Sequence, residues 1–208
     1  MDGPKKKRAV SFFDGQNLFR HAMAAFGHFH PNFDPIKLAD AICASKGWER
    51  RGVRFYTGVP LAQHDPMWHG YWAARSLAMR RSGILVTTRP LRYHSEKVVM
   101  SDGSEQTIYT PHEKGIDVRL ALDAVRLARQ DQYDVAIIFS QDSDLGEIVE
   151  EIREISEHEK RWIKVACAYP SSATASARRG IAKTDWVPMD QAFYDQCLDP
   201  RDYRPRTG

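Results

Sequence analysis

Residues 135–139 (VAIIF) form the stretch that most limits how this chain can fold. They are apolar without alternation and rich in β-branched side chains, which is typical of a strand buried on both faces in a parallel sheet. Polar residues follow at once, and apolar residues then recur at helical spacing from Leu145 to Ile155. The pattern predicts a strand, a short turn and a helix within an open α/β sheet.

The turn after this strand carries two carboxylates, Asp142 and Asp144. In open α/β sheets, ligands bind at the carboxyl ends of the strands, near the point where the strand order reverses. Capping of the following helix by Ser143 or Asp144 would account for one acid. It would not account for Asp142, so the turn is a candidate functional site.

Length and composition are those of an ordinary soluble protein with one sizeable domain. The chain has 208 residues, of which 27% are charged and 42% hydrophobic. Its net charge of +3 is compatible with a polyanionic partner but does not require one. The three cysteines lack metal-type spacing and are expected to be free thiols in a reducing compartment. We find no signal peptide and no apolar run near the roughly 20 residues of a membrane span, so we expect a cytoplasmic protein without a membrane partner.

The chain divides into a basic arm, one domain and a short tail. Residues 1–8 include four consecutive basic residues, and we predict a disordered arm, although a targeting signal or an RNA-binding arm would have the same composition. The domain is expected to cover residues 9–198. Residues 199–208 are expected to form a frayed tail.

The first predicted strand, residues 9–13, also ends in an acid. Asp14 follows it, and Asn17 lies in the first turn of the next helix. A helix cap would explain Asp14 or Asn17, but hardly both. We predict further strands over residues 53–59, 83–88, 162–169 and 185–187, and further helices over residues 35–43, 66–81 and 191–197. Trp68, Tyr71 and Trp72 could stack on bases, but packing against the core is the simpler interpretation.

Residues 89–112 do not fit another strand and helix. Two segments suited to strands flank a turn that contains Gly103, which predicts a β-hairpin. Its interleaved basic and aromatic residues suit a nucleic-acid backbone with an occasional stacked base, but charges that protect the edge of an ordinary hairpin would look the same. The candidate substrate-binding residues are Arg92, Lys97, His112, Lys114, Arg178 and Arg179.

A helix that starts near Ile116 places a further acid among apolar residues. On a helical wheel, Asp117 falls inside the apolar arc, where a lone carboxylate is costly unless it is paired, protonated or bound to a metal. Asp123 lies at the edge of the polar face, so we expect it to be solvated.

Four carboxylates from three segments are therefore expected at one edge of the sheet: Asp14, Asp117, Asp142 and Asp144. This requires the strands before Asp14 and Asp142 to be neighbours at the reversal of strand order. Four like charges repel strongly unless a cation neutralises them. Oxygen ligands without His or Cys select Mg²⁺ or Mn²⁺, which are used in phosphoryl chemistry. Lys114 could then neutralise a phosphate.

Three motifs resemble the NYN domain of the LabA-like group, a branch of the PIN-like nuclease superfamily. They are FFDGQNL at residues 12–18, KGIDV at 114–118 and FSQDSDL at 139–145. The resemblance implies a three-layer α/β/α sandwich with a central, mainly parallel sheet, here with an inserted hairpin. It also implies a Mg²⁺- or Mn²⁺-dependent ribonuclease, which we expect to cut RNA endonucleolytically.

The resemblance also assigns roles to individual residues. Asp14, Asp117, Asp142 and Asp144 would be metal ligands, and Asn17 would help to order the site. Asp123 and Ser140 are candidates of second rank. The expected partner is single-stranded or structured RNA, and a homodimer is possible.

Two other functions fit parts of the pattern. A haloacid-dehalogenase-like phosphatase also places acids after parallel strands, but it needs a second Asp two residues after the nucleophile, and Gln16 stands there. A non-catalytic RNA-binding or scaffold protein with the same fold is disfavoured, because it would have no evident reason to keep the full set of acids.

Overall fold

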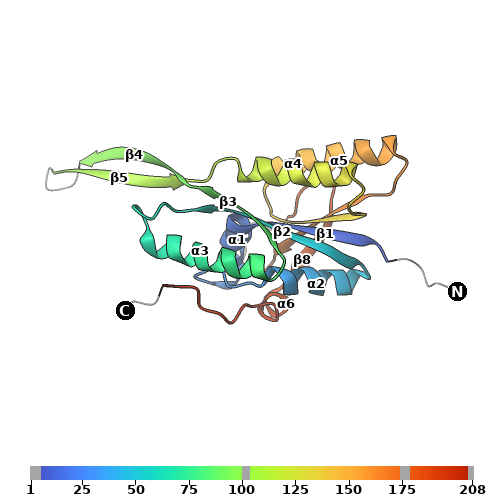
Figure 1. Ribbon diagram of the computed structural model, residues 1–208, viewed down its shortest axis with the longest axis horizontal. Coiled ribbons are helices and arrows are strands. Elements are labelled where there is room, and N and C mark those ends of the chain that lie inside the picture. The colour runs from blue at the N-terminus through green and yellow to red at the C-terminus, as the bar shows by residue number, and fades with distance from the viewer. Residues whose placement is uncertain (1–5, 100–103, 174–178, 206–208) are drawn as a thin grey trace.

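A computed structural model describes residues 6–99, 104–173 and 179–205 (Figure 1). Within these residues, six strands form a central sheet in the order β3-β2-β1-β6-β7-β8, and every neighbouring pair is parallel. The strands are β1 (Arg8–Asp14), β2 (Glu49–Val59), β3 (Leu85–Pro90), β6 (Val135–Phe139), β7 (Lys164–Pro170) and β8 (Asp185–Met189). All five residues of β6 are buried, as their unbroken apolar run predicts.

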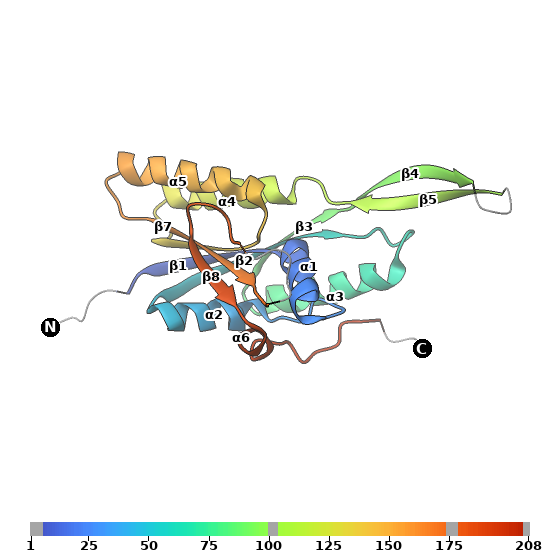
Figure 2. The same ribbon diagram turned by 180° about the vertical axis from the view of Figure 1, so that it is seen from behind.

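Helices cover both faces of this sheet. One face carries α4 (Ile116–Arg129) and α5 (Gly146–His158); the other carries α1 (Gly15–Phe26), α2 (Pro35–Lys46), α3 (Pro66–Arg81) and α6 (Gln191–Asp195) (Figures 1 and 2). A short 3₁₀ turn, η1 (Ser143–Leu145), precedes α5. Each helical layer has its own buried apolar cluster against the sheet. The predicted α/β/α sandwich is confirmed.

The strand order reverses between β1 and β6. The chain runs outward from β1 through β2 to β3, and then returns to β6 beside β1 before continuing to β7 and β8. Phe13 pairs with Phe139, so the residues that follow the two strands leave the sheet side by side. The condition that the sequence analysis set for the candidate site, that these two strands are neighbours, is therefore met. Ligand sites in open α/β sheets occur at such a reversal.

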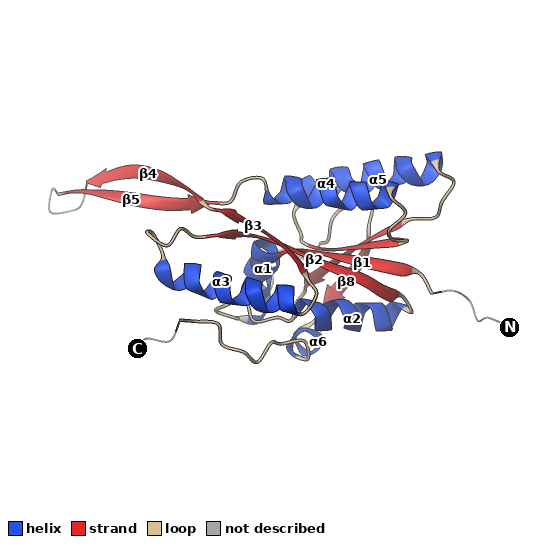
Figure 3. Ribbon diagram, in the orientation of Figure 1, coloured by secondary structure: helices blue, strands red, loops and turns tan. Residues whose placement is uncertain are grey.

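The predicted hairpin is also present, as β4 (Arg92–Val99) and β5 (Glu105–His112). The two strands pair antiparallel from Arg92 opposite His112 to Val99 opposite Glu105. The hairpin extends away from the sandwich (Figure 3). It begins just after β3 and ends just before α4, so its root lies at the carboxyl edge of the sheet. Its predicted turn at residues 101–103 lies outside the described residues.

The chain termini depart from the simplest expectation. Arg8 belongs to β1, and its side chain binds Asp131 and Asp134. Residues 199–205 of the predicted tail run beside α3, where Tyr203 contacts the ring of Tyr71 edge-on and donates a hydrogen bond to Asp199 (Figure 1).

The expected packing of three aromatic residues of α3 is confirmed. Tyr71 and Trp72 are buried in the core and Trp68 packs partly against it. Among the described residues, the three cysteines are free and buried. No helix in the same part of the chain is both long and apolar enough to cross a membrane.

Candidate functional site

Asp14 ends β1 and is 5% exposed. Its carboxylate caps α1 by accepting a hydrogen bond of 3.0 Å from the backbone N–H of Asn17. The Ser140 hydroxyl, which follows β6, donates to the same carboxylate at 3.4 Å. Burial raises the pKa of Asp14 to about 6, and the charge of nearby Asp142 acts in the same direction. Asp14 is therefore a buried carboxyl group with a second acid beside it.

Asn17, in the first turn of α1 just after β1, connects this segment to the end of β6. Its side-chain oxygen accepts a hydrogen bond of 2.9 Å from the backbone N–H of Gln141. Asp14 thus serves as the helix cap, and Asn17 has a separate role between the two strands. Two residues on either side of Gln141 are tied together as well, because the Asp142 N–H donates to the Ser140 hydroxyl at 3.2 Å.

Asp142, rather than Ser143 or Asp144, caps the turn after β6. Its carboxylate accepts from the Asp144 N–H at 3.0 Å. Asp142 is half-buried, whereas Asp144 is exposed. Capping therefore accounts for Asp142, the acid that the sequence pattern left unexplained. Asp144 does not cap the turn and lies at the exposed rim of the candidate site.

Glu113, which the sequence analysis did not identify, joins this edge of the sheet. Its carboxylate accepts from the backbone N–H of Gly58 near the end of β2. A Cβ atom at position 58 would lie 2.7 Å from that carboxylate, so glycine permits the approach. Burial raises the pKa of Glu113 to about 7, and the charges of Asp14 and Asp117 act in the same direction.

Asp117 lies half-buried in the first turn of α4. Gly115 occupies the N-cap with a φ of 76°, and the described structure has no side-chain cap hydrogen bond at this helix end. Asp117 therefore does not perform the capping role that is usual for a first-turn Asp. Its charge instead acts on Glu113.

Asp14, Asp142, Glu113 and Asp117 thus surround the carboxyl ends of β1, β2 and β6. Within the residues that the structure describes, no three acidic, His or Cys side chains are grouped closely enough to coordinate one ion. The donors nevertheless fit a hard divalent cation, because they are carboxylates whose mutual charge and burial raise the pKa of Asp14 and Glu113.

The expectation that Asp123 is solvated is wrong. Asp123 is 2% exposed and accepts hydrogen bonds from Arg119, Arg126 and Tyr56, at 2.9, 2.7 and 3.0 Å. Arg54 of β2 lies 3.8 Å away. The polar side of α4 is covered here by β2, which a helical wheel does not show. Six residues of helix, about 9 Å, separate Asp123 from Asp117.

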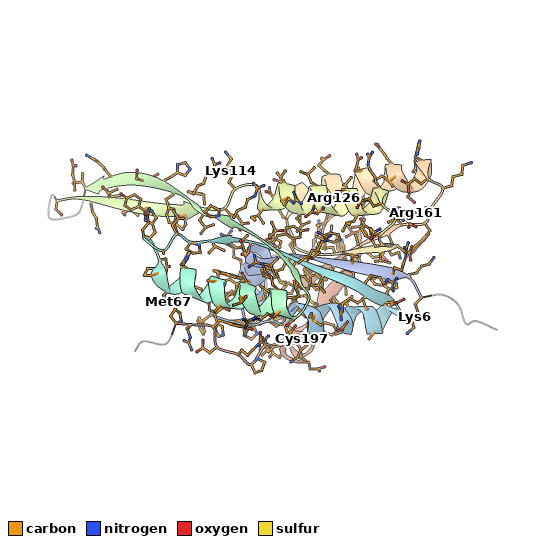
Figure 4. All side chains as sticks on the ribbon, in the orientation of Figure 1. Lys6, Met67, Lys114, Arg126, Arg161 and Cys197 are labelled. Atoms are coloured by element: carbon orange, nitrogen blue, oxygen red, sulfur yellow. The ribbon has the colours of Figure 1, made fainter. Side chains whose placement is uncertain are left out.

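Most of the candidate basic residues lie around the same edge of the sheet. Lys114 is exposed at the junction of hairpin and α4 (Figure 4). The backbone oxygen of Arg179 accepts from the Gln141 side chain at 2.9 Å, next to the end of β6. Arg92, Lys97 and His112 are exposed on the hairpin, where Lys97 pairs with Glu105 at 3.4 Å. Arg178 lies outside the described residues.

The sequence profile of the NYN domain matches residues 8–179. The chain belongs to the NYN domain family. Members of this family are generally metal-dependent nucleases that act on RNA, so the match supports a PIN-like nuclease for this chain. The match concerns the family as a whole and does not select the LabA-like group.

A comparison with solved structures agrees on the fold. The crystal structure of VPA0982, a protein of unknown function from Vibrio parahaemolyticus RIMD 2210633, superposes with a TM-score of 0.52 and 19% identity, covering 93% of this chain and 99% of that one. MurG from Acinetobacter baumannii gives a TM-score of only 0.34 at 9% identity, over 88% of this chain and 45% of that one. No curated protein matches the chain.

Proposed function

We propose that this NYN domain protein is a Mg²⁺- or Mn²⁺-dependent endoribonuclease of the LabA-like group that hydrolyses RNA phosphodiester bonds. The metal ligands would be Asp14, Asp142 and Asp117, with Asp144 at the rim and Glu113 as an additional carboxylate. The same proposal includes a cytoplasmic location and a possible homodimer.

One observation carries the proposal: buried Asp14 lies beside Asp142 at the reversal of strand order, with Glu113 and Asp117 close by. Burying a carboxylate next to other carboxylates is unfavourable in the absence of a cation. A protein that only needed a helix cap at Asp14 could use Ser, Thr or Asn at no such electrostatic cost. The arrangement is therefore better explained by a cation than by capping alone.

The protein side chains around Asp14 hold it in position for this chemistry. A bound Mg²⁺ or Mn²⁺ would activate a water molecule for in-line attack and stabilise the leaving oxygen. The Asn17 N–H and the Ser140 hydroxyl both bond to the Asp14 carboxylate, and Asn17 also ties it to the turn that carries Asp142. In this proposal, Lys114 and Arg179 would bind RNA phosphates beside the acids, and Arg92, Lys97 and His112 would bind the backbone further along the hairpin.

A non-catalytic RNA-binding protein is the second candidate, and a specific observation favours it. Asp14 and Asp142 both cap helical turns, so both could be retained for the fold without any catalysis. The two candidates differ in what a charge-removing substitution does. Asn preserves a cap but weakens a metal ligand.

Cleavage of a labelled panel of single-stranded and structured RNAs tests the proposal. We expect products with 5′-phosphate and 3′-hydroxyl ends in Mg²⁺ or Mn²⁺ and no cleavage in chelator. A circular RNA has no ends, so its cleavage would establish endonucleolytic action. Cleavage that persists in chelator, or products with 2′,3′-cyclic phosphate, would contradict the proposal.

Matched variants separate catalysis from capping. Asp14→Asn and Asp142→Asn should each lower turnover by orders of magnitude. Each removes a metal ligand, and the metal ion stabilises the transition state by several kcal/mol. Asp34 caps α2 through the same kind of side-chain bond, so Asp34→Asn is the control and should leave turnover nearly unchanged. Absence of turnover in wild type, with RNA binding intact, would favour the non-catalytic candidate. Turnover that is equal in wild type and all three variants would show that Asp14 and Asp142 are not metal ligands.

A further inference from the structure

A small cavity lies at the root of the hairpin. It has a volume of about 250 Å³ and is lined chiefly by Pro60, His64, Leu91, Tyr93, Tyr109 and Pro111. We refer to the space that these residues line as the aromatic cavity. Clefts that hold drug-sized ligands measure about 300–1,000 Å³, so this one suits a smaller group.

Three rings form a partly fixed wall of the aromatic cavity. His64 stacks on Tyr93 with ring centres 3.9 Å apart, and Tyr109 lies 4.9 Å from His64. The Tyr93 hydroxyl accepts a hydrogen bond of 3.2 Å from the Leu61 N–H, which holds the stacked pair against the loop after β2. Tyr109 is 53% exposed. Tyr109 is therefore an accessible aromatic ring beside the stacked rings of His64 and Tyr93.

The aromatic cavity adjoins the candidate metal site. Leu91 is bonded through its N–H to Val59 at the end of β2, and its side chain lies against Gly58. Gly58 is also the residue whose N–H binds Glu113. Asp14 pairs with Tyr56 of β2, and Pro60 of the cavity follows Tyr56 by four residues, roughly 13 Å of extended chain, so the cavity lies about two nucleotides of RNA from the end of β1.

An acidic residue in the cavity wall restricts which chemical groups can bind in the cavity. Asp65 lines the cavity, and its carboxylate accepts from the Trp68 N–H at 3.0 Å. A phosphate placed there would be repelled by that charge, whereas the neutral ring of a base would not. Every base has a face that stacks on aromatic side chains, and proteins that bind single strands combine such stacking with a basic path for the backbone.

We infer that the aromatic cavity holds an unpaired base of an RNA strand whose backbone passes the candidate metal site. The inference rests on the proposed function and adds a base subsite to it. The backbone on either side of that base would follow Lys114 and the exposed basic residues of the hairpin. The protein would then bind single-stranded RNA better than a duplex, because only an unpaired base can leave the stack at low cost.

Fluorescence of 2-aminopurine, whose emission is quenched by stacking, tests the subsite directly. A short single-stranded RNA with this base at successive positions is mixed with the whole protein in chelator, so that metal-dependent cleavage is excluded. We expect position-dependent quenching with wild type and with Tyr109→Phe, and its loss with Tyr109→Leu. The affinity of Tyr109→Leu should fall about fivefold to a hundredfold, and an abasic nucleotide at the quenched position should have a similar effect on wild type.

Ile108→Ala is the matched control. Ile108 precedes Tyr109 in β5, is 45% exposed and points to the opposite face of the hairpin, so affinity and quenching should stay as in wild type. Because Tyr109 is itself largely exposed, Tyr109→Leu should melt at the same temperature as wild type.

The outcomes for the subsite and for the proposed function are separable. Equal affinity of wild type and Tyr109→Leu, equal affinity for abasic RNA, or no RNA binding would overturn the subsite, even if the protein cleaves RNA in Mg²⁺. Tyr109-dependent quenching in a protein that cleaves no RNA would retain the subsite and overturn the nuclease proposal.

Discussion

The Asn17 side chain and the Gln141 backbone N–H join the ends of β1 and β6 through a hydrogen bond of 2.9 Å. The bond spans the reversal of strand order and connects the segment that carries Asp14 to the turn that carries Asp142. A second, longer bond, from the Ser140 hydroxyl to the Asp14 carboxylate at 3.4 Å, joins the same two segments. Asn17 is therefore a positioning residue for the candidate site.

Asn17→Ala should separate positioning from folding. It leaves the half-buried Gln141 N–H without this acceptor, which should lower the free energy of unfolding by roughly 1 kcal/mol, as measured in urea. Turnover on saturating RNA should fall by much more than that loss of stability explains. Gln16→Ala, which removes a longer bond of 3.3 Å to Gly58 from the same helical turn, is the control and should retain most activity. Unchanged turnover in Asn17→Ala would remove Asn17 from the site.

Asp123 should be important for stability and not for metal binding. Asp123→Asn would leave Arg54, Arg119 and Arg126 around a neutral group, and since Arg119 and Arg126 remain partly exposed to water, the cost should be that of charged hydrogen bonds, about 1.5–3 kcal/mol. Urea unfolding should show a loss of this size. Asp40→Asn breaks an exposed pair with Arg50 and should cost less than about 1 kcal/mol. Equal losses in the two variants would contradict the buried role of Asp123.

The two central strands could be predicted because burial on both faces leaves a local pattern. Two unbroken apolar runs, residues 9–13 and 135–139, each end in acids, and this was enough to expect both as buried strands of a parallel sheet. That the two strands are neighbours was a condition for the candidate site, and the pairing of Phe13 with Phe139 meets it. The hairpin was equally visible, since its strands flank a turn with glycine. The position of the candidate site followed from these elements.

What the sequence did not reveal depends on contacts between distant segments. A helical wheel gives the direction in which Asp123 leaves the axis of α4. It does not show that Tyr56 and Arg54 of β2 lie over this side chain and bury it. Glu113 becomes half-buried because Gly58, in β2, leaves room for its carboxylate. Residues 199–205 run beside α3, where Tyr203 meets Tyr71. The signal for Glu113 was present as a glycine near the end of a strand, a position where another group can approach the backbone closely.

Arg8 should make the stability of the protein depend on pH in acid. Its hydrogen bonds hold the pKa of Asp134 below the ordinary value. A carboxyl group with a lowered folded-state pKa stabilises the protein above its unfolded pKa of about 3.9, and the stabilisation is lost as pH falls through the folded-state value. Arg8→Gln should therefore cost about 1 kcal/mol at pH 7, and the difference from wild type should shrink below about pH 4.

Urea unfolding of both proteins between pH 7 and pH 3 measures this difference. Arg51→Gln, which breaks an exposed pair with Glu49, is the control and should show a small difference that varies little with pH. A constant gap between wild type and Arg8→Gln across the whole range would show that the ion pair with Asp134 is not its source.

Asp117 should have little net effect on the stability of the metal-free protein and should bind the metal when it is present. No cap hydrogen bond depends on it in the described structure, and its charge adds to those of Glu113 and Asp14. Asp117→Asn keeps the size of the side chain and removes this repulsion. It also removes a favourable interaction with the helix N-terminus that is worth about 0.3–1 kcal/mol. The two effects oppose each other, so the metal-free variant should unfold within about 1 kcal/mol of wild type.

The response of Asp117→Asn to Mg²⁺ or Mn²⁺ then separates a ligand from a structural residue. A metal that binds only the folded state raises its stability by about 2.7 kcal/mol at a concentration 100 times its Kd, and a variant with weakened affinity gains less at the same concentration. Wild type should therefore show a rise in melting temperature with metal that is much smaller in Asp117→Asn. Glu147→Gln removes an exposed first-turn acid from α5 and should show the full rise. A large loss of metal-free stability would make Asp117 structural, and an unchanged response to metal would remove it from the proposed ligands.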